Sequence, residues 1–171
     1  MKSRNKIILR KYIPRDADYI VKWIKDERSF HYWCADRYPN FPIFADDMNC
    51  YYNKFGDNMH IFTALDAFDN VIGHFTFRYP NESDKTVIRL GFVIIDDKLR
   101  GKGIGKQMVS CAVDYAFNNL KANELTLGVF ENNLNAFNCY KSCGFIETGL
   151  IEQYNCSGET WNCIEMHILN E

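Results

Sequence analysis

The sequence predicts an α/β protein in which helices flank both faces of a central mixed sheet. Three observations support this fold class. Strand and helix patterns follow one another in the order β-α-α-β-β-β-α-β-α-β-β. The run Thr86–Ile95 is almost continuously apolar, which is typical of a central strand buried on both faces. Ile104–Leu120 carries its apolar residues at helical spacing, so one side of this helix faces a core.

The N-terminal part predicts a strand and a helix, followed by an irregular segment. Ile7–Tyr12 begins with β-branched residues and reads as a short strand. Asp16–Lys25 places four apolar residues on one helix face, after an aspartate that can cap the helix. Ser29–Ala45 is rich in aromatic residues, and Pro39 and Pro42 interrupt any periodic structure there.

The remaining elements can be assigned in order along the chain. Asp46–Lys54 predicts a short helix, because its first turn is acidic and the helix dipole favours anions there. Met59–Asp66 and Asn70–Tyr79 flank a turn-prone sequence and predict a hairpin. The C-terminal part then predicts a strand, a helix that ends at a glycine, and two closing strands: Glu124–Phe130, Asn133–Cys143, Phe145–Leu150 and Thr160–Leu169.

Length and composition predict one globular domain over residues 1–171. The apolar share of 47% and the charged share of 25% are ordinary for a folded protein. A formal charge of −2 provides no field that would attract a nucleic acid. No apolar run approaches the roughly 18–20 residues of a membrane span, and the apolar part of the basic N-terminus is too short for a secretory signal. We therefore expect a cytoplasmic protein with neither nucleic-acid nor membrane partners.

The seven cysteines do not predict a metal centre. Zinc sites need closely spaced ligand pairs, whereas this chain has no Cys-x-x-Cys pair and only four scattered histidines. Cys139 and Cys143 lie four residues apart on a predicted helix and could form half a site. The alternative is that they are small apolar side chains that fill the core in a reducing compartment.

The segment Leu99–Gln107 predicts a binding site for a phosphate or pyrophosphate. Gly101, Gly103 and Gly105 remove side chains from a turn that leads directly into a helix, so backbone N–H groups and the helix dipole can converge on an anion. Nearby lysines and Arg100 add positive charge. The glycine spacing fits neither the dinucleotide fingerprint nor the P-loop. A glycine-rich helix cap that binds nothing remains the alternative reading of this segment.

Two motifs resemble those of a known family. Arg100-x-x-Gly103-x-Gly105 after an apolar strand is similar to the signature of the GNAT superfamily of acetyl-CoA-dependent N-acetyltransferases. The segment Val129–Phe145, with an Asn, an Ala and a Tyr before its final Gly-Phe, resembles the second motif of that superfamily. The element order matches over nearly the whole chain, which implies a mostly antiparallel sheet. Residues 7–24 more weakly resemble the branch that acetylates ribosomal-protein N-termini.

The resemblance implies acetyl-CoA as cosubstrate, an amine as acceptor and no metal. It assigns backbone groups of three strand residues to the pantetheine arm and the thioester carbonyl: Val93, Ile94 and Ile95. It assigns the pyrophosphate to the glycine-rich turn: Arg100, Gly101, Lys102, Gly103, Ile104, Gly105 and Lys106. Asn133 would hydrogen-bond the cofactor arm, or alternatively cap its helix. Tyr140, two helical turns further on, would face the sulfur as the catalytic residue, or alternatively fill the core.

The reaction implied by the resemblance is direct acetyl transfer to a primary amine, either a small molecule or a peptide N-terminus. An N–H near Ile94 would stabilise the oxyanion, and the Tyr140 hydroxyl would donate to the departing thiolate. Some relatives place a base five residues before the Asn of the second motif, but Gly128 occupies that position here. A chain of water molecules is therefore as suitable as a direct base. The sequence also contains scattered surface carboxylates that could serve: Asp26, Glu27, Glu82, Asp84 and Glu147.

The sequence is compatible with more than one acceptor substrate and more than one oligomeric state. Aromatic residues between the first two helices could pack an apolar or cationic substrate, with His31 as a base, or could simply fill the core: Phe30, Tyr32, Trp33, Tyr38, Phe41 and Phe44. Because a carboxylate is missing at position 128, a non-catalytic acyl-CoA sensor is the rival hypothesis. A phosphate-binding redox or nucleotide enzyme is a weaker one. The oligomeric state is not determined, and a homodimer is compatible with the sequence.

Overall fold

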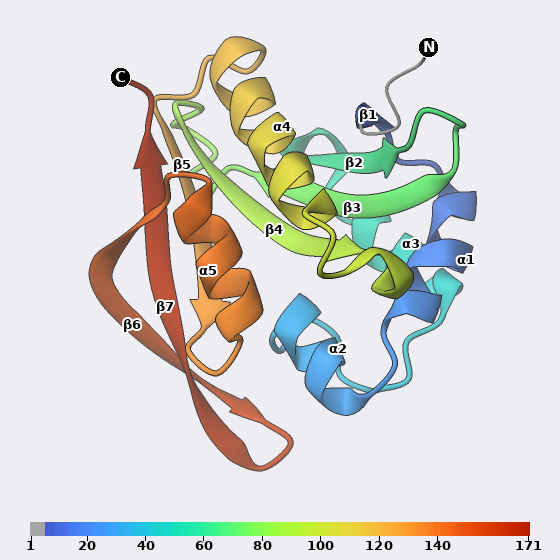
Figure 1. Ribbon diagram of the computed structural model, residues 1–171. Coiled ribbons are helices and arrows are strands. Elements are labelled where there is room, and N and C mark those ends of the chain that lie inside the picture. The colour runs from blue at the N-terminus through green and yellow to red at the C-terminus, as the bar shows by residue number, and fades with distance from the viewer. Residues whose placement is uncertain (1–5) are drawn as a thin grey trace.

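A computed structural model describes residues 6–171, whose strands form one seven-stranded sheet (Figure 1). The order is β1-β2-β3-β4-β5-β7-β6, and every neighbouring pair is antiparallel except β4 with β5. The strands are β1 (Ile8–Lys11), β2 (Met59–Leu65), β3 (Val71–Arg78), β4 (Val87–Ile95), β5 (Glu124–Phe130), β6 (Ile146–Cys156) and β7 (Glu159–Leu169). The predicted mixed, mostly antiparallel sheet is confirmed. Residues 1–5, part of the predicted domain and of the basic N-terminal segment, lie outside the described residues.

Helices lie on both faces of the sheet, as predicted. In Figure 1, α4 and α5 lie in front of the strands, whereas α1, α2 and α3 belong to the layer on the other face. The helices are α1 (Ala17–Ile20), α2 (Glu27–Cys34), α3 (Ala45–Asn53), α4 (Ile104–Asn118) and α5 (Leu134–Ser142). Short 3₁₀ turns add Pro14–Asp16, Val21–Trp23, Gly56–Asn58 and Asp97–Leu99.

The expectation that Ser29–Ala45 would be wholly irregular is wrong, because its first residues belong to α2. The Asp26 carboxylate accepts a hydrogen bond from the Ser29 amide at 2.7 Å, and the Asp26 amide donates to the Ser29 hydroxyl at 3.1 Å. This reciprocal cap begins the helix in spite of its aromatic content. The helix ends at Cys34, and Ala35 follows with a positive φ of 53°.

The remaining boundaries agree with the predictions to within two residues, with two exceptions. The predicted helix Asp16–Lys25 is divided into α1 between two 3₁₀ turns. Strand β6 continues to Cys156, whereas the prediction ended it at Leu150. It extends so far because it pairs with β7 up to the turn at Ser157–Gly158, contributing one arm of a long hairpin.

Side-chain alternation divides the sheet into two faces. On β3, Phe75 and Phe77 point into the main core beneath α4, which also holds Ile88 and Leu90 of β4. The intervening β3 residues therefore point to the face covered by α1 to α3, where a second apolar cluster is centred on aromatic side chains. Each face of the sheet thus has its own apolar core. Thr76 and Arg78 of β3 and Arg89 of β4 lie on the face that α2 covers.

Asp16 connects the first two strands to the turn that precedes α1. Its side chain is only 2% exposed. The carboxylate accepts two hydrogen bonds from Arg10, at 2.7 and 2.8 Å, one from the Ile13 amide at 2.9 Å and one from the Thr63 hydroxyl at 2.6 Å. Burial opposes ionisation, but these donors outweigh it, so the pKa of Asp16 lies below its usual value.

Candidate active site

The strands β4 and β5 separate along their length. Their parallel register joins Val87 to Glu124, Ile88 to Leu125 and Arg89 to Thr126, and over residues 6–171 it stops there. In Figure 1 the carboxyl-terminal part of β4 curves away from β5. The remaining backbone groups on these facing edges lack a strand partner, so a ligand that carries amides can satisfy them. Val93, Ile94 and Ile95, the residues predicted to bind the pantetheine arm, lie on this part of β4.

A bulge in β4 accompanies this separation. The register runs from Thr76–Gly91 to His74–Ile94, so two residues of β4, Phe92 and Val93, lie opposite one residue of β3. Phe92 has a φ of 51°, a conformation that costs a residue with a side chain about 1 kcal/mol or more. Its ring packs against Trp33, and its carbonyl accepts a hydrogen bond from the indole of Trp33 at 3.1 Å. The aromatic layer therefore holds the bulge in place.

The glycine-rich turn lies between the end of β4 and α4. Gly101 and Gly103 have φ values of 74° and 79°, and a Cβ at either position would meet nothing within 4 Å. The backbone conformation, rather than lack of space, therefore requires glycine at both. Gly103 is the N-cap of α4, so the first amides of that helix are free to meet an anion. A Cβ at Gly105 would lie 3.7 Å from the Ile95 side chain and 4.0 Å from Cys139, which places this turn against both β4 and α5.

The charged residues of this turn are exposed, but the side chain of Arg100 is held against the neighbouring layer. Lys102 and Lys106 lie on the surface, and the Lys102 ammonium donates to the Lys98 carbonyl at 3.1 Å. The guanidinium of Arg100 instead donates to the Trp23 carbonyl at 3.3 Å, which ties the turn to the layer of α1. The seven residues predicted to enclose the pyrophosphate thus gather at one helix N-terminus, and the free amides there fit a diphosphate group.

Asn133 and Tyr140 both belong to α5. Asn133 is the N-cap of this helix, and its side-chain oxygen accepts a hydrogen bond from the Ala136 amide at 3.4 Å. This long bond leaves a role in ligand contact compatible with capping. Tyr140 is 8% exposed within the main core, where its ring meets Phe145 edge-on. Burial raises the pKa of its phenol well above the usual value, so the hydroxyl stays protonated and can donate a hydrogen bond.

A pocket of about 100 Å³ spans the separated strands on the face covered by α2. Tyr32 and Trp33 of α2 line it from one side. Gly91 and Phe92 of β4 line it from the sheet, together with Gly128 on the facing strand β5. Because it reaches both strands where they have separated, this α2 pocket is the route by which an acceptor could approach the β4 edge.

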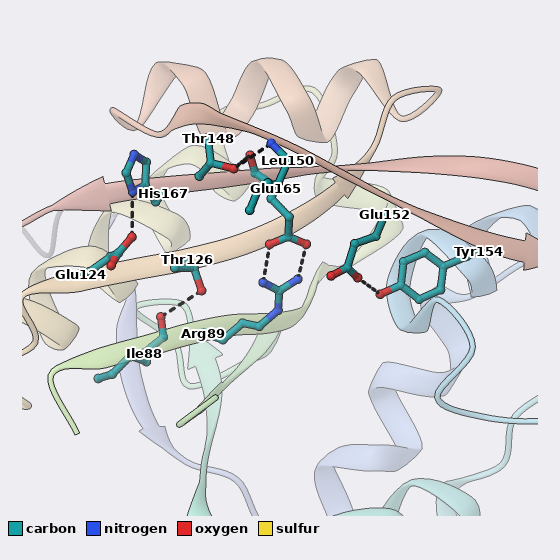
Figure 2. Close-up of polar contacts among 10 residues, drawn as sticks. All are labelled: Ile88, Arg89, Glu124, Thr126, Thr148, Leu150, Glu152, Tyr154, Glu165 and His167. Atoms are coloured by element: carbon teal, nitrogen blue, oxygen red, sulfur yellow. Dashed lines mark hydrogen bonds and ion pairs between the residues drawn. The ribbon is translucent and has the colours of Figure 1, made fainter. Parts of the chain in front are cut away.

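Sequence reasoning missed the carboxylate that lies next to Gly128. Glu165 of β7 pairs with Gly128 in register, and a Cβ at Gly128 would lie 3.1 Å from its carboxylate and 2.8 Å from the guanidinium of Arg89. Arg89 donates two hydrogen bonds to Glu165, at 2.6 and 2.8 Å, as Figure 2 shows. Burial acts against the charged guanidinium, but Glu165 raises the pKa of Arg89 above its usual value. The ion pair and the Cys163 sulfur, 2.8 Å from such a Cβ, occupy the space that a side chain at position 128 would need.

The other carboxylates considered from the sequence lie away from the pocket lining. Asp26 caps α2, and Asp84 accepts hydrogen bonds from the amide and hydroxyl of Thr86. Glu27, Glu82 and Glu147 are exposed. His31 hydrogen-bonds the Ala35 carbonyl and the Ser157 hydroxyl, each at 2.9 Å, through its two ring nitrogens. Asp26, Asp84 and His31 therefore stabilise local structure. The three exposed glutamates make no contact that points to catalysis.

The aromatic segment divides between core and pocket. Phe30, Trp33 and Tyr38 are buried in the cluster beneath α1 to α3, whereas Phe44 is 65% exposed. Trp33, together with the half-buried Tyr32, also reaches the α2 pocket.

Within residues 6–171 no group of His, Cys, Asp or Glu side chains is arranged to hold a metal ion, and no helix is long and apolar enough to cross a membrane. All seven cysteines are free thiols.

Comparison with known proteins identifies one relative that covers nearly the whole chain and others that cover part of it. It is 29% identical over 171 residues to a spermidine N(1)-acetyltransferase of Vibrio cholerae, with 96% of this chain and 94% of the relative covered. A spermine/spermidine N(1)-acetyltransferase of Bacillus subtilis is 28% identical over 74 residues, which cover 43% of this chain and 49% of the relative.

The fold has solved counterparts as well. A crystal structure of spermidine N-acetyltransferase from Vibrio cholerae in complex with CoA and spermine matches with a TM-score of 0.80 and 26% identity, covering 95% of each chain. Residues 18–145 match the acetyltransferase (GNAT) family. The chain belongs to this family and is an acetyl-CoA-dependent N-acetyltransferase.

Proposed function

We propose that residues 1–171 act as one domain that transfers the acetyl group directly to a primary amine in a ternary complex. The acceptor is a small-molecule amine or a peptide N-terminus. The observation that carries this proposal is the separation of β4 from β5 between the glycine-rich turn and the α2 pocket. A donor held along β4 and an acceptor in the pocket would meet at that gap, which removes the entropic cost of a bimolecular encounter.

In this proposal the chain binds acetyl-CoA mainly through its backbone. Amides between Arg100 and Lys106 hold the pyrophosphate at the N-terminus of α4, where the dipole favours anions. Residues 93–95 hydrogen-bond the pantetheine arm along the open edge of β4. Asn133, at the N-terminus of α5, adds a side-chain contact to that arm. Bound acetyl-CoA supplies the activated acyl group.

The chemical step forms an N–C bond and breaks a C–S bond. The amine nitrogen attacks the carbonyl carbon, and the N–H near Ile94 stabilises the negative charge that develops on the carbonyl oxygen, an effect of about 2.7–4 kcal/mol per donor. The sulfur leaves as a thiolate, which the Tyr140 hydroxyl stabilises by donating a hydrogen bond, and the proton that the amine loses finally protonates the sulfur. The acceptor loses its proton through water, because Glu165, the carboxylate beside Gly128, is held by Arg89.

The relatives indicate which acceptors to assay first, although they do not decide the acceptor of this chain. Their names include spermidine and spermine, so a polyamine belongs in any panel. The resemblance of residues 7–24 to the ribosomal-protein branch adds peptide N-termini. A non-catalytic acyl-CoA sensor would bind acetyl-CoA without acceptor-dependent release of CoA, and no comparison supports it. A homodimer stays a prediction; one solved form of the Vibrio cholerae relative is described as dodecameric.

Substituting Tyr140→Phe is expected to lower kcat by about 10-fold and to leave the affinity for CoA unchanged. The loss is smaller than the roughly 10²–10⁴-fold typical of general acids, because a thiol of pKa about 8.5 leaves readily without protonation. Steady-state release of CoA measures kcat, and calorimetry measures the affinity. Tyr115→Phe, in the same core layer, is the matched control and should behave like the parent. An unchanged kcat in Tyr140→Phe would remove this residue from the mechanism.

A further inference from the structure

Two arginines lie directly opposite each other across β3 and β4. Arg78 and Arg89 are register partners, and both line the α2 pocket. Like charges placed opposite each other on one face of a sheet are unfavourable. Burial, followed by the nearby charges of Arg89 and Arg37, lowers the pKa of Arg78. The fold therefore keeps a pair that weakens it, in a pocket next to the reacting edge.

Only one of these two arginines has a carboxylate partner. Arg89 is neutralised by its paired hydrogen bonds to Glu165 (Figure 2). Among the described residues no carboxylate forms an ion pair with Arg78, and its guanidinium is partly buried. A partly buried cation without a counter-ion is costly, and the cost disappears when an anion binds.

The rest of the pocket strengthens this positive character. Arg37 supplies a third guanidinium, which is exposed and lies 3.7 Å from the carboxylate of its neighbour Asp36. No Asp or Glu lines the pocket. The nearby Glu152 is exposed, and its carboxylate accepts a hydrogen bond from Tyr154 at 2.9 Å. The residues that line the pocket thus present three guanidinium groups and no carboxylate to a ligand.

We propose that the acceptor is a primary amine that also carries an anionic group, a carboxylate or a phosphate, which binds Arg78. This inference rests on the proposed function and names the substrate class for it. Arg78 lies two residues along β3 from Thr76, which pairs with Gly91 where β4 opens toward the ligand. Two residues of strand span about 7 Å, so a compact molecule can hold its anion at Arg78 and its amine at the gap.

The same arrangement disfavours a polyamine. An aliphatic amine has a pKa of about 10.4, so spermidine carries several positive charges at neutral pH. The ammonium groups that do not react would have to lie beside Arg78, Arg89 or Arg37. This chain would therefore differ in acceptor from the relatives that are named for spermidine, although it shares their fold.

The test compares acceptors that differ only in the anionic group. CoA release is measured with amino acids and their carboxamides, with phosphoethanolamine and ethanolamine, and with spermidine. We expect at least one anionic amine to exceed its uncharged counterpart by about 10-fold in kcat/KM, the effect of one hydrogen-bonded ion contact. The carboxylate and phosphate arms identify which anion is preferred.

Variants connect that preference to the pocket. Arg78→Gln is expected to reduce kcat/KM for the anionic acceptor by about 10-fold and to bring it close to the value for the uncharged counterpart, with the KM for acetyl-CoA unchanged. Arg15→Gln, an exposed arginine outside the pocket, is the matched control. If Arg78→Gln unfolds, Arg37→Gln serves instead, because Arg37 is exposed and its removal leaves the sheet intact.

Two results would overturn the inference, and they are distinguishable. If spermidine is the best acceptor and the arginine variants accelerate its acetylation, the acceptor is a polyamine and the proposed acetyl transfer stands. If neither spermidine nor any other amine of the panel releases CoA from acetyl-CoA, both the proposed function and this inference fail.

Discussion

Gly103→Val is expected to weaken CoA binding by about 100-fold while the protein remains folded. Gly103 adopts a φ of 79°, which a β-branched residue can reach only with strain, and a Cβ there meets no neighbour. The backbone around Gly103 will move to relieve the strain, because no atom within 4 Å of the added Cβ holds it in place. Backbone amides that converge on the diphosphate then lose their alignment. Calorimetric titration with CoA measures the effect.

Gly149→Val provides the matched control for this substitution. Gly149 lies on β6 with a φ of 87°, is exposed, and likewise has nothing within 4 Å of an added Cβ. The strain in the backbone is therefore similar, but the site is not involved. We expect a comparable loss of thermal stability in both variants and an unchanged affinity for CoA in Gly149→Val. Parent-like binding by Gly103→Val would show that the turn does not hold the diphosphate.

Asp16→Ala is expected to lower the free energy of unfolding by about 3 kcal/mol and the Tm by about 10 °C. The substitution removes the acceptor of four hydrogen bonds and leaves the guanidinium of Arg10 without its counter-ion. The estimate takes the lower end of the range for buried pairs, because the Arg10 side chain is 33% exposed and water can solvate it. Urea denaturation measures the change.

The pH dependence of stability gives a second readout for Asp16. Its pKa is lowered in the folded state relative to about 3.9 in the unfolded state, so its contribution is complete above that pH. The contribution is lost as the pH falls through the folded pKa. The difference between parent and Asp16→Ala should therefore shrink in acid. Asp18→Ala, at an exposed aspartate in the adjoining helix α1, should stay within about 0.5 kcal/mol of the parent at every pH.

Most of the fold could be predicted from the sequence, because the periodicity of apolar residues within a segment decides whether that segment forms a strand or a helix. The apolar run that became β4 and the helical spacing of α4 gave boundaries within two residues. The helix α2 was missed because its aromatic residues and the later prolines concealed the cap formed by Asp26 and Ser29. An acidic residue followed three positions later by serine was the available signal.

The local part of the candidate site could be predicted from the sequence, whereas the contacts between distant strands could not. The glycine-rich turn is local, so the glycine pattern of Leu99–Gln107 predicts an anion site there, and the family resemblance assigns individual residues to it. Glu165 reaches Gly128 only because β7 pairs with β5, and Arg78 faces Arg89 only through the register of β3 with β4. Strand pairing of this kind depends on contacts distant in sequence, which no short motif records. A carboxylate next to Gly128 could therefore not be found by searching along β5.

The three register pairs between β4 and β5 have a thermodynamic consequence. They are the strand pairing that joins strands β1 to β4 with strands β5 to β7, so a molecule that bridges the gap completes the sheet. A ligand that binds only the native state raises the free energy of unfolding by about 2.7 kcal/mol at 100 times its Kd. Under the proposed binding mode, the concentration of CoA therefore changes the free energy of unfolding of the enzyme as well as its rate.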